Sequence, residues 1–318
     1  VIFGTPLTSG LAANQQTVSV SSDLASVIRL DLGSEGSWNS NTYELLMNKA
    51  YSGEIDNTIT DEKMFEVDMI LDANYPSTVK RSISNFCDNV RGDCVNVLDC
   101  GLQANVEGTI AYRNSDVGMS SFRTLIQAQD MVIDDVYTGS EIKVTSTYFL
   151  ADKIPSIDNA SGMQYTFCGP RRGVITGFKS INFVPSEMDK ERLYRHQINY
   201  IERDPTRTNF ASQLTSQVAE SALSNFNNVR SLMRIQRIVK RFADDYRFEF
   251  NDNATISNMN SNLNEILKPF LSDRTCSSIS ASVYSSDYDR LNKTVRIRVD
   301  LVFTGLIERI RIETAVNK

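Results

Sequence analysis

The chain has 318 residues, of which 41% are hydrophobic, so it is long enough for about two domains with sizeable cores. Its formal net charge is -6 and its pI is about 5.1, which argues against general affinity for nucleic acid. The single histidine, His196, nearly excludes histidine-rich metal sites and His-based catalytic triads. No apolar run reaches the ~18 residues needed to span a bilayer, so we expect no membrane partner.

Five cysteines occur, and no two of them have Cys-x-x-Cys spacing. We expect reduced, mostly buried thiols in a protein made in the cytosol. Disulfides or a zinc site are the alternatives, but the spacing of Cys87, Cys94 and Cys100 does not match common zinc-ligand pairs. The sequence begins at Val1 rather than Met and ends at Lys318, which fits a protease-trimmed fragment and equally an engineered piece.

Residues 1–205 predict a mixed α/β domain. A strand at residues 65–71, a helix that opens after Pro76 and a strand at residues 94–98 follow one another closely. This order favours a parallel pair of strands joined by a helix. Further strands are expected at residues 17–21, 25–32, 123–133 and 141–148, and helices at residues 41–50, 149–157 and, as a charged helix or loop, 187–196.

Glycines and a proline are dense in residues 167–177, which predicts a backbone held in tight turns. The pair Arg171 and Arg172 in this stretch allows an anion-binding interpretation. A structural turn whose arginines face another subunit is the interpretation that we favour.

Residues 221–252 predict a long amphipathic helix with an acidic and aromatic exit. Apolar residues recur at spacings of three and four from Val229 to Phe242, which is typical of a buried helical face. A second line of side chains along the same helix, which we call the arginine stripe, consists of Arg230, Arg234, Arg237 and Arg241. Like charges at such spacings repel by roughly 0.2–0.5 kcal/mol per pair, so the arginine stripe needs acidic partners.

Local acids lie only at the C-terminal end of the arginine stripe, at Asp244, Asp245 and Glu249. They are placed to compensate the last two arginines. Arg230 and Arg234 need partners elsewhere. Two alternatives stay open: acids from the same chain, or an interface with another molecule.

Residues 206–318 predict a second, α+β domain, which begins after a break at Asp204 and Pro205. Residues 294–303 alternate strictly between apolar and polar side chains, which indicates a strand with one buried face. The expected fold is two helices packed on a small antiparallel sheet. Its other elements are a helix at residues 256–271, bent by Pro269, and strands at residues 279–284 and 307–314.

Three carboxylates allow an enzyme hypothesis. Asp99 ends a buried strand, and Asp68 and Asp72 lie on the preceding one, so the three could form a Mg²⁺ site at the sheet edge. A Mg-dependent α/β phosphohydrolase-like enzyme using Asp68, Asp72 and Asp99 is therefore the alternative function. The simpler interpretation is that Asp99 caps the turn after its strand and that the other two are ordinary edge charges.

The order of these segments resembles contractile bacteriophage tail sheath proteins. FEVDMIL at residues 65–71, a helix and RGDCVNVLD at residues 91–99 are similar to the family's α/β core, in which a strand ends in Asp. Residues 167–177, followed by INFVP at residues 181–185, resemble the turn that leads toward the family's C-terminal domain.

Residues 215–252 resemble a sheath signature, and the strands VRIRVDLVF and ERIRIE follow it in the expected order. The match is loose over residues 65–185 and tighter over residues 208–318, which suggests a distant branch, such as a giant-phage sheath. The matching signature residues are Thr215, Ser221, Asn227, Arg230, Ile235, Phe248, Glu249, Asn251 and Asp252.

The resemblance implies a structural subunit that polymerises with identical copies in a helical array around a tail tube protein. It implies contraction without nucleotide hydrolysis, which drives the tube through the host envelope. The expected location is the virion, after assembly in the host cytoplasm, and no enzymatic activity, cofactor, metal or nucleic acid is implied.

The resemblance also implies an inner C-terminal domain that faces the tube. Terminal arms add strands to neighbouring subunits, so a trimmed fragment without them is expected to be monomeric in isolation. The arginine stripe then becomes the predicted subunit or tube interface.

Overall fold

The computed structural model describes residues 40–53 and 58–306. The chain divides into two compact units, residues 1–40 and residues 41–318. Every described strand belongs to the second unit. The strands expected at residues 17–21, 25–32 and 307–314 lie outside the described residues. None of the helices in the described ranges is long and apolar enough to cross a membrane.

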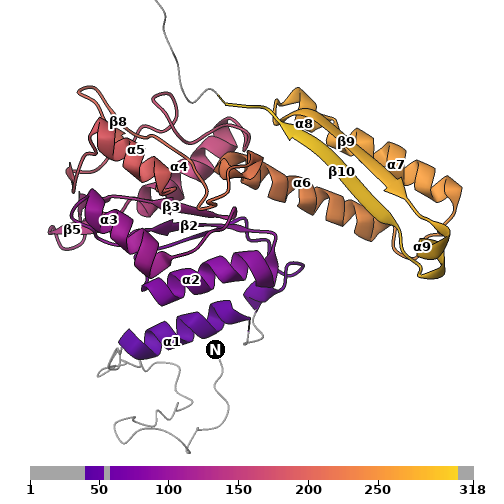
Figure 1. Cartoon of the computed structure of the whole chain (residues 1–318), viewed down its shortest axis with the longest axis horizontal. Helices are drawn as coiled ribbons and strands as arrows, with labels where there is room; N and C mark the ends of the chain where they lie inside the picture. The colour runs from indigo at the N-terminus through magenta and orange to yellow at the C-terminus, as the bar shows by residue number, and fades with distance from the viewer. Residues whose placement is uncertain (1–39, 54–57, 307–318) are drawn as a thin grey trace, which may run out of the picture. The chain divides into compact units, whose positions relative to one another are not determined.

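A three-stranded parallel sheet in the order β1-β2-β3 organises the first half of the described chain (Figure 1). Helix α2 (Ser77–Asn85) joins the first two strands, which confirms the expected parallel unit. It continues as a wider π-helical segment, η2 (Phe86–Arg91). The strands are β1 (Met69–Leu71), β2 (Val95–Asp99) and β3 (Thr124–Gln127), and all residues of β2 are buried.

Two small antiparallel sheets flank this region. The single strand expected at residues 123–133 is two strands, because Gln129 has a positive φ of 71° that breaks the extended backbone. One sheet has the order β5-β4-β6, and the other pairs β7 with β8. These strands are β4 (Asp130–Asp134), β5 (Glu141–Thr145), β6 (Ser180–Ile181), β7 (Ile201–Arg203) and β8 (Thr208–Phe210).

The helices expected in this half are confirmed, and α3 was not expected. Helix α3 begins where the Asn105 side chain accepts a hydrogen bond from the backbone N–H of Gly108. The remaining helical segments are α1 (Ser40–Ser52), η1 (Thr58–Thr60), α3 (Val106–Tyr112), η3 (Arg113–Val117), α4 (Thr147–Ala160), α5 (Glu187–Arg195) and η4 (Ala222–Ser224).

The predicted long helix is α6 (Phe226–Asp245), which is shorter than residues 221–252. It begins at Asn225, whose side chain accepts a hydrogen bond from the N–H of Asn227, and it ends at Tyr246. Residues 246–252 form the connection to the next helix rather than part of α6.

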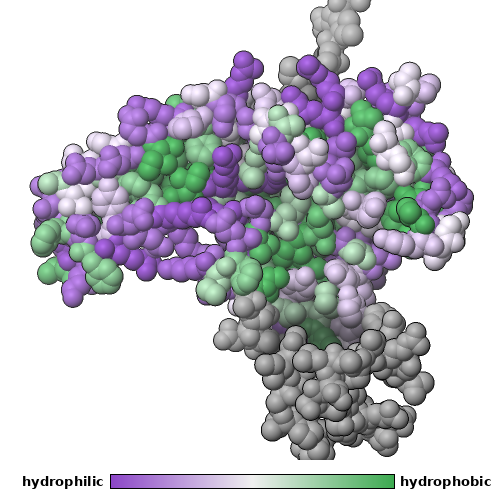
Figure 2. Space-filling view, turned by 180° about the vertical axis from the view of Figure 1, so that it is seen from behind, coloured by the Kyte–Doolittle hydropathy of each residue, from purple (hydrophilic) through white to green (hydrophobic). Residues whose placement is uncertain are grey.

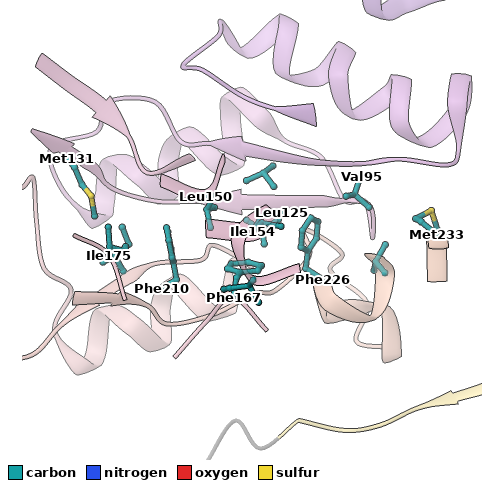
Figure 3. Close-up of a cluster of buried hydrophobic side chains, with 14 residues drawn as sticks. Val95, Leu125, Met131, Leu150, Ile154, Phe167, Ile175, Phe210, Phe226 and Met233 are labelled. Atoms are coloured by element: carbon teal, nitrogen blue, oxygen red, sulfur yellow. The ribbon is translucent and has the colours of Figure 1, made fainter. Parts of the chain in front are cut away.

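The first hydrophobic core, which we call the sheet core, lies between the parallel sheet, α4 and the start of α6 (Figure 3). At its centre, the Phe167 ring meets the rings of Phe210 and Phe226 edge-on, with centroids 6.1 and 6.4 Å apart. All three side chains are buried. Val229 and Met233 continue the contact along α6.

The second core, which we call the ribbon core, lies under a two-stranded antiparallel ribbon of β9 and β10. Ile235 and Phe242 of α6 pack here against Leu263 of α7. The helix expected at residues 256–271 is two helices, because Pro269 cannot continue α7 and instead begins α8. The elements are α7 (Asn253–Leu267), α8 (Pro269–Ser272), β9 (Cys276–Tyr284), α9 (Asp287–Leu291) and β10 (Arg296–Phe303).

The predicted domain division at residue 205 does not coincide with the change of core. Phe210 and Phe226 lie beyond residue 205 but belong to the sheet core. The change occurs inside α6, between Met233 and Ile235. The helix therefore connects the two halves by a continuous hydrogen-bonded backbone rather than by a flexible linker.

A buried ion-pair cluster fixes the carboxyl ends of β1 and β2. Lys80 of α2 is completely buried, and its Nζ lies 2.8 Å from a carboxylate oxygen of Asp72 and also pairs with the carboxylate of Asp99. The same Nζ donates to the carbonyl oxygen of Asp99 at 2.9 Å. The buried charges of Lys80, Asp72 and Asp99 thus compensate one another.

The protonation of this cluster follows from burial. Burial and the neighbouring Asp99 carboxylate raise the pKa of Asp72 to about 6, against the opposing effect of Lys80. Burial by itself lowers the pKa of Lys80, but Asp99 and Asp72 outweigh it and hold that pKa above its usual value. Lys80 therefore stays charged at neutral pH.

We expect Lys80→Met to lower the free energy of unfolding by about 3–5 kcal/mol at pH 7, because it leaves two buried carboxylates without their cation. Without the ammonium, the pKa of Asp72 rises further above its unfolded value of about 4. An acid whose pKa is raised by folding stabilises the folded state only while it is protonated. The deficit should therefore shrink as the pH falls through the raised pKa of Asp72 in the variant toward about 6, the pKa of Asp72 in the original protein, which urea unfolding at pH 7.5 and pH 5 can measure.

Lys268→Met is the matched control, because the Lys268 side chain is mostly exposed and pairs with Glu265 one helical turn away. We expect it to change stability by no more than about 0.5 kcal/mol at either pH. A loss of similar size for both variants would contradict the role of the buried cluster.

Candidate functional site

The structure does not assemble the predicted carboxylate site. Asp72 and Asp99 come together, but around the ammonium of Lys80 rather than around an open position. The Asp68 side chain lies apart from them, 66% exposed and paired with Arg237. Asp99 also accepts the N–H of Gly101 at 2.8 Å, so it does cap the turn after its strand. Among the residues that the structure describes, no cluster of potential ligands is arranged to hold a metal ion.

Two cavities in the described part of the chain have volumes of about 700 and 130 Å³. None of the three predicted catalytic carboxylates lines either of them. The larger cavity contains Lys190, whose ammonium pairs with Glu187 at 2.6 Å and with Glu202. Burial lowers the pKa of Lys190, but these two glutamates outweigh it and raise it to about 12. The third acid of the lining, Glu191, pairs with Arg195 outside the cavity at 2.6 Å, so each charged group that lines the cavity has an ion-pair partner.

The turn-rich stretch at residues 167–177 is tied to β8. Gly169 has a φ of 85° and donates its N–H to the carbonyl oxygen of Phe210 at 2.7 Å. A Cβ at Gly173 would lie 2.7 Å from the carbonyl oxygen of Phe167, so only glycine fits there. Arg172 stacks on the Tyr165 ring at 4.3 Å. A structural turn accounts for these contacts, and a contact of its arginines with another subunit stays a prediction.

The arginine stripe of α6 finds partners within the chain at three of its four positions. Arg230, with a side chain only 5% exposed, pairs with Asp158 of α4. Arg237 pairs with Asp68, and Arg241 pairs with Glu66. These acids differ from the nearby ones that the sequence suggested.

Arg234 is the exception in the stripe. It is exposed and has no acidic partner among residues 40–53 and 58–306. Its guanidinium lies 5.6 Å from the centroid of the Phe270 ring. An interface role for the arginine stripe stays a prediction. Arg234 is the position best suited to that role, because a contact with another molecule would not have to replace an ion pair within the described residues.

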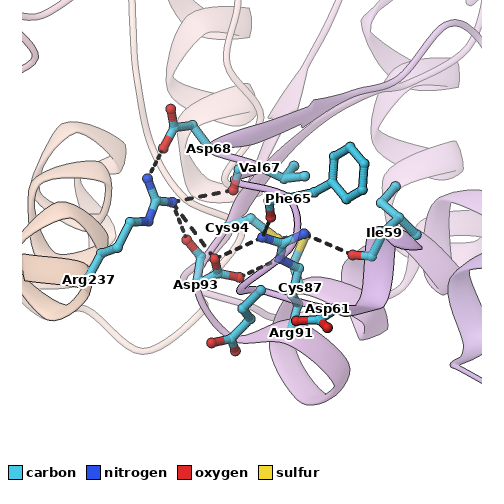
Figure 4. Close-up of polar contacts among 12 residues, drawn as sticks. Ile59, Asp61, Phe65, Val67, Asp68, Cys87, Arg91, Asp93, Cys94 and Arg237 are labelled. Atoms are coloured by element: carbon cyan, nitrogen blue, oxygen red, sulfur yellow. Dashed lines mark hydrogen bonds and ion pairs between the residues drawn. The ribbon is translucent and has the colours of Figure 1, made fainter. Parts of the chain in front are cut away.

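Residues 62–68, which we call the acidic segment, run along α6 beside the arginine stripe. Besides its pair with Asp68, Arg237 donates to the carbonyl oxygen of Val67 at 3.4 Å and to that of Asp93 at 3.2 Å (Figure 4). Two lysine pairs extend the row: Lys240 with Glu62, and Lys63 with Asp244 at 3.7 Å. The second half of α6 is thus attached to the acidic segment mainly by charges.

The β9–β10 ribbon has one buried and one polar face. Exposure alternates along all eight residues of β10, as the sequence predicts, and its inward side chains belong to the ribbon core. On the outer face, Arg298 binds Asp300 of the same strand at 2.9 Å. Serines of β9 face outward beside them, at Ser278, Ser280 and Ser282.

The β9 edge of the ribbon is closed by side chains of α7. Asn264 donates to the carbonyl oxygen of Ala281 at 2.8 Å and accepts its N–H at 2.9 Å. Asn260 accepts the N–H of Val283 at 3.2 Å. Both asparagines thereby occupy the groups that an added strand would need.

The β10 edge is open among the described residues. Because the N–H and carbonyl of Ala281 point to α7, its opposite residue Val299 forms a pair without hydrogen bonds across the ribbon. The N–H and carbonyl of Val299 therefore point away from β9, and those of Ile297 and Leu301 do so by the same alternation. Within residues 40–53 and 58–306, the β10 edge is therefore the one available to an extended segment.

An apolar tip lies at the end of the ribbon where α6 leads into α7. Phe248 is fully exposed, Phe250 is 81% exposed and Leu291 of α9 is 83% exposed. A hydrogen bond of 2.6 Å from Arg290 to Asn253 joins the two segments. Figure 2 shows hydrophobic residues at the surface at this end of the molecule, on the left of the view. Exposed aromatic residues of this size are typical of protein–protein contacts.

Comparisons by sequence give no match, either with models of protein families or with curated proteins. Solved structures do match. A sheath protein of the PVC extracellular contractile injection system in the contracted state has a TM-score of 0.68 at 14% identity, over 88% of this chain and 81% of that one. The contracted helical sheath of the anti-feeding prophage has a TM-score of 0.64 at 13% identity, over 79% and 70%.

A third match is the sheath tail protein of Desulfitobacterium hafniense, with a TM-score of 0.60 at 13% identity, over 96% of this chain and 68% of that one. These matches span most of the chain. At these identities a structural match shows the fold. The chain therefore has the fold of contractile tail sheath proteins.

Proposed function

We propose that this protein is the structural subunit of a contractile sheath, which polymerises with identical copies in a helical array around a tail tube. The observation that carries the proposal is the sheath fold, which extends over 79–96% of the chain in the three matches. The role is mechanical rather than enzymatic. It would be performed in a phage or phage-like particle, where contraction drives the tube through the host envelope without nucleotide hydrolysis.

The outer edge of β10 is the proposed acceptor for a strand from a neighbouring copy. Strand addition joins subunits by backbone hydrogen bonds, and it needs an edge whose donors and acceptors are free. The β10 edge meets this condition, whereas Asn260 and Asn264 close the β9 edge. The apolar tip and Arg234 are further contact candidates, for a neighbour or for the tube.

Assembly is the direct test of the sheath role. We expect the complete natural product of the gene that encodes this chain to form tubes in negative-stain electron microscopy, alone or with its tail tube protein. Contraction of these tubes should proceed without added nucleotide. Uniformly monomeric protein under both conditions would contradict the proposal.

Val299→Pro should prevent tube formation and leave the subunit folded. Proline is tolerated on a strand edge where the lost N–H faces solvent, but it removes a donor that an added strand would use. Circular dichroism would check the fold, and electron microscopy would check assembly.

Val299→Ala is the matched control for this variant. It loses similar apolar contact with the ribbon core but keeps the N–H, so we expect it to form tubes. Equal tube yields from the proline and alanine variants would show that assembly does not use the outer edge of β10.

Arg234→Glu should weaken tube formation while the isolated subunit keeps its stability within about 1 kcal/mol, because only the contact with the Phe270 ring is lost. Arg237 is unsuitable for this test, since its replacement would break the pairs that hold α6 to the acidic segment. The measurements are urea unfolding and the protein concentration at which tubes appear.

Arg234→Lys keeps the positive charge and is expected to assemble close to normally. Raised salt should weaken assembly of the original protein more than that of Arg234→Glu, because an exposed charge contact is screened. Unchanged assembly of Arg234→Glu would show that the Arg234 side chain is solvated and makes no contact that assembly needs.

A further inference from the structure

Two cysteine thiols are in contact inside the molecule. The sulfur of Cys87, in η2, lies 3.4 Å from that of Cys94, the residue before β2. Both side chains are completely buried, and both cysteines are unbonded thiols. The contact was not anticipated from the sequence, because the two residues are neither at Cys-x-x-Cys spacing nor on one secondary-structure element.

The backbone holds the two thiols in this position. Between them, Gly92 turns the chain with a φ of 75° and donates its N–H to the carbonyl oxygen of Cys87 at 3.2 Å. Arg91 closes the same turn by binding the Asp93 carboxylate at 2.7 Å (Figure 4). The thiols therefore meet because a fixed turn brings them together, rather than by chance approach of two mobile side chains.

We propose that Cys87 and Cys94 form a redox-active dithiol, which hydrogen peroxide converts to an intramolecular disulfide within the folded subunit. The inference is independent of the sheath role. The sulfurs need to approach from 3.4 Å to about 2.05 Å, and we expect small side-chain and backbone adjustments to supply this.

The reaction proceeds in two steps that balance. In the first step, one thiolate attacks a peroxide oxygen, the O–O bond breaks, and a sulfenic acid and hydroxide form. In the second step, the other thiol attacks the sulfenic sulfur, an S–S bond forms, and water leaves with the thiol proton. In total, two thiols lose two electrons and two protons, and hydrogen peroxide is reduced to two molecules of water.

The pKa values of the two thiols favour one order of attack, whereas the bond itself depends only on their contact. The hydrogen bond with Cys87 lowers the pKa of Cys94, and Arg91 and Arg123 act in the same direction. The same contact, together with burial, raises the pKa of Cys87. The proposal therefore takes Cys94 as the first thiolate and Cys87 as the resolving thiol.

Oxidation would act on the attachment of α6. The disulfide would close a short loop that contains Asp93, whose carbonyl oxygen accepts a hydrogen bond from Arg237 of α6 at 3.2 Å. The Asp93 carboxylate lies 3.9 Å from the same guanidinium. Fixing this loop holds one end of the row of charges in place, so the oxidised subunit should unfold at a higher temperature.

The experiment treats the folded full chain with hydrogen peroxide, alkylates the remaining thiols in denaturant and analyses tryptic peptides by mass spectrometry. Trypsin cleaves after Arg91, between the two cysteines, so the disulfide joins peptide 82–91 to peptide 92–113. We expect this cross-linked pair to lose two hydrogens and to separate on reduction. The thermal midpoint should rise by at least about 2 °C in the oxidised protein.

Variants locate the bond. Peptide 92–113 also contains Cys100, so fragment ions must place the link at Cys94, and Cys100→Ala must retain it. Cys87→Ala and Cys94→Ala should each abolish it, and Cys276 should stay alkylated as a thiol in every case. Peroxide-treated protein with both thiols intact, with a sulfinic acid at Cys94, or with a bond through Cys100 would overturn the proposal.

Discussion

Helix α6 is the element on which the arrangement of the described residues depends. Val229 and Met233 are buried in the sheet core, and Ile235 and Phe242 are buried in the ribbon core, so one helix is part of both. It has 20 residues, with neither glycine nor proline, and a helix of that length extends over about 30 Å. The ribbon therefore cannot move far against the sheet core without breaking helical hydrogen bonds or withdrawing buried side chains. In a sheath subunit, a pull on β10 would reach the parallel sheet through this helix.

The arginines of α6 act in two physically different ways. Arg230 is buried and its pair with Asp158 compensates a desolvated charge, so loss of either partner would be costly. Arg241 and Lys240 are mostly exposed, and isolated pairs of that kind contribute only about 0–1 kcal/mol each. Their number and alignment along the acidic segment set how α6 lies against the sheet, while exposure to solvent leaves this attachment sensitive to salt.

Periodic patterns made the helices and strands of the ribbon core predictable, because each has one continuous buried face. Contacts between distant parts of the chain could not be predicted in this way. Asp68 and Glu66 lie far in sequence from the arginines that they bind. Nothing in the sequence indicated that Lys80 lies between Asp72 and Asp99, where the hypothesis placed Mg²⁺. Chain order revealed the sheath-like arrangement, but the partner of each charged side chain required three-dimensional structure.

The two asparagines of α7 make the two edges of the ribbon different, although the sequence pattern of its strands does not distinguish them. On a helix surface, Asn260 and Asn264 look like ordinary solvated side chains, yet they bind the backbone of β9. An open two-stranded ribbon with two free edges would permit unordered strand addition on both sides. With the β9 edge closed, the proposed strand addition has one acceptor edge among the described residues, that of β10. The strict alternation of β10 then favours one register for an added strand, since a slip by one residue would turn its apolar side chains to the polar face. One acceptor with a defined register is what a regular helical array of identical subunits requires.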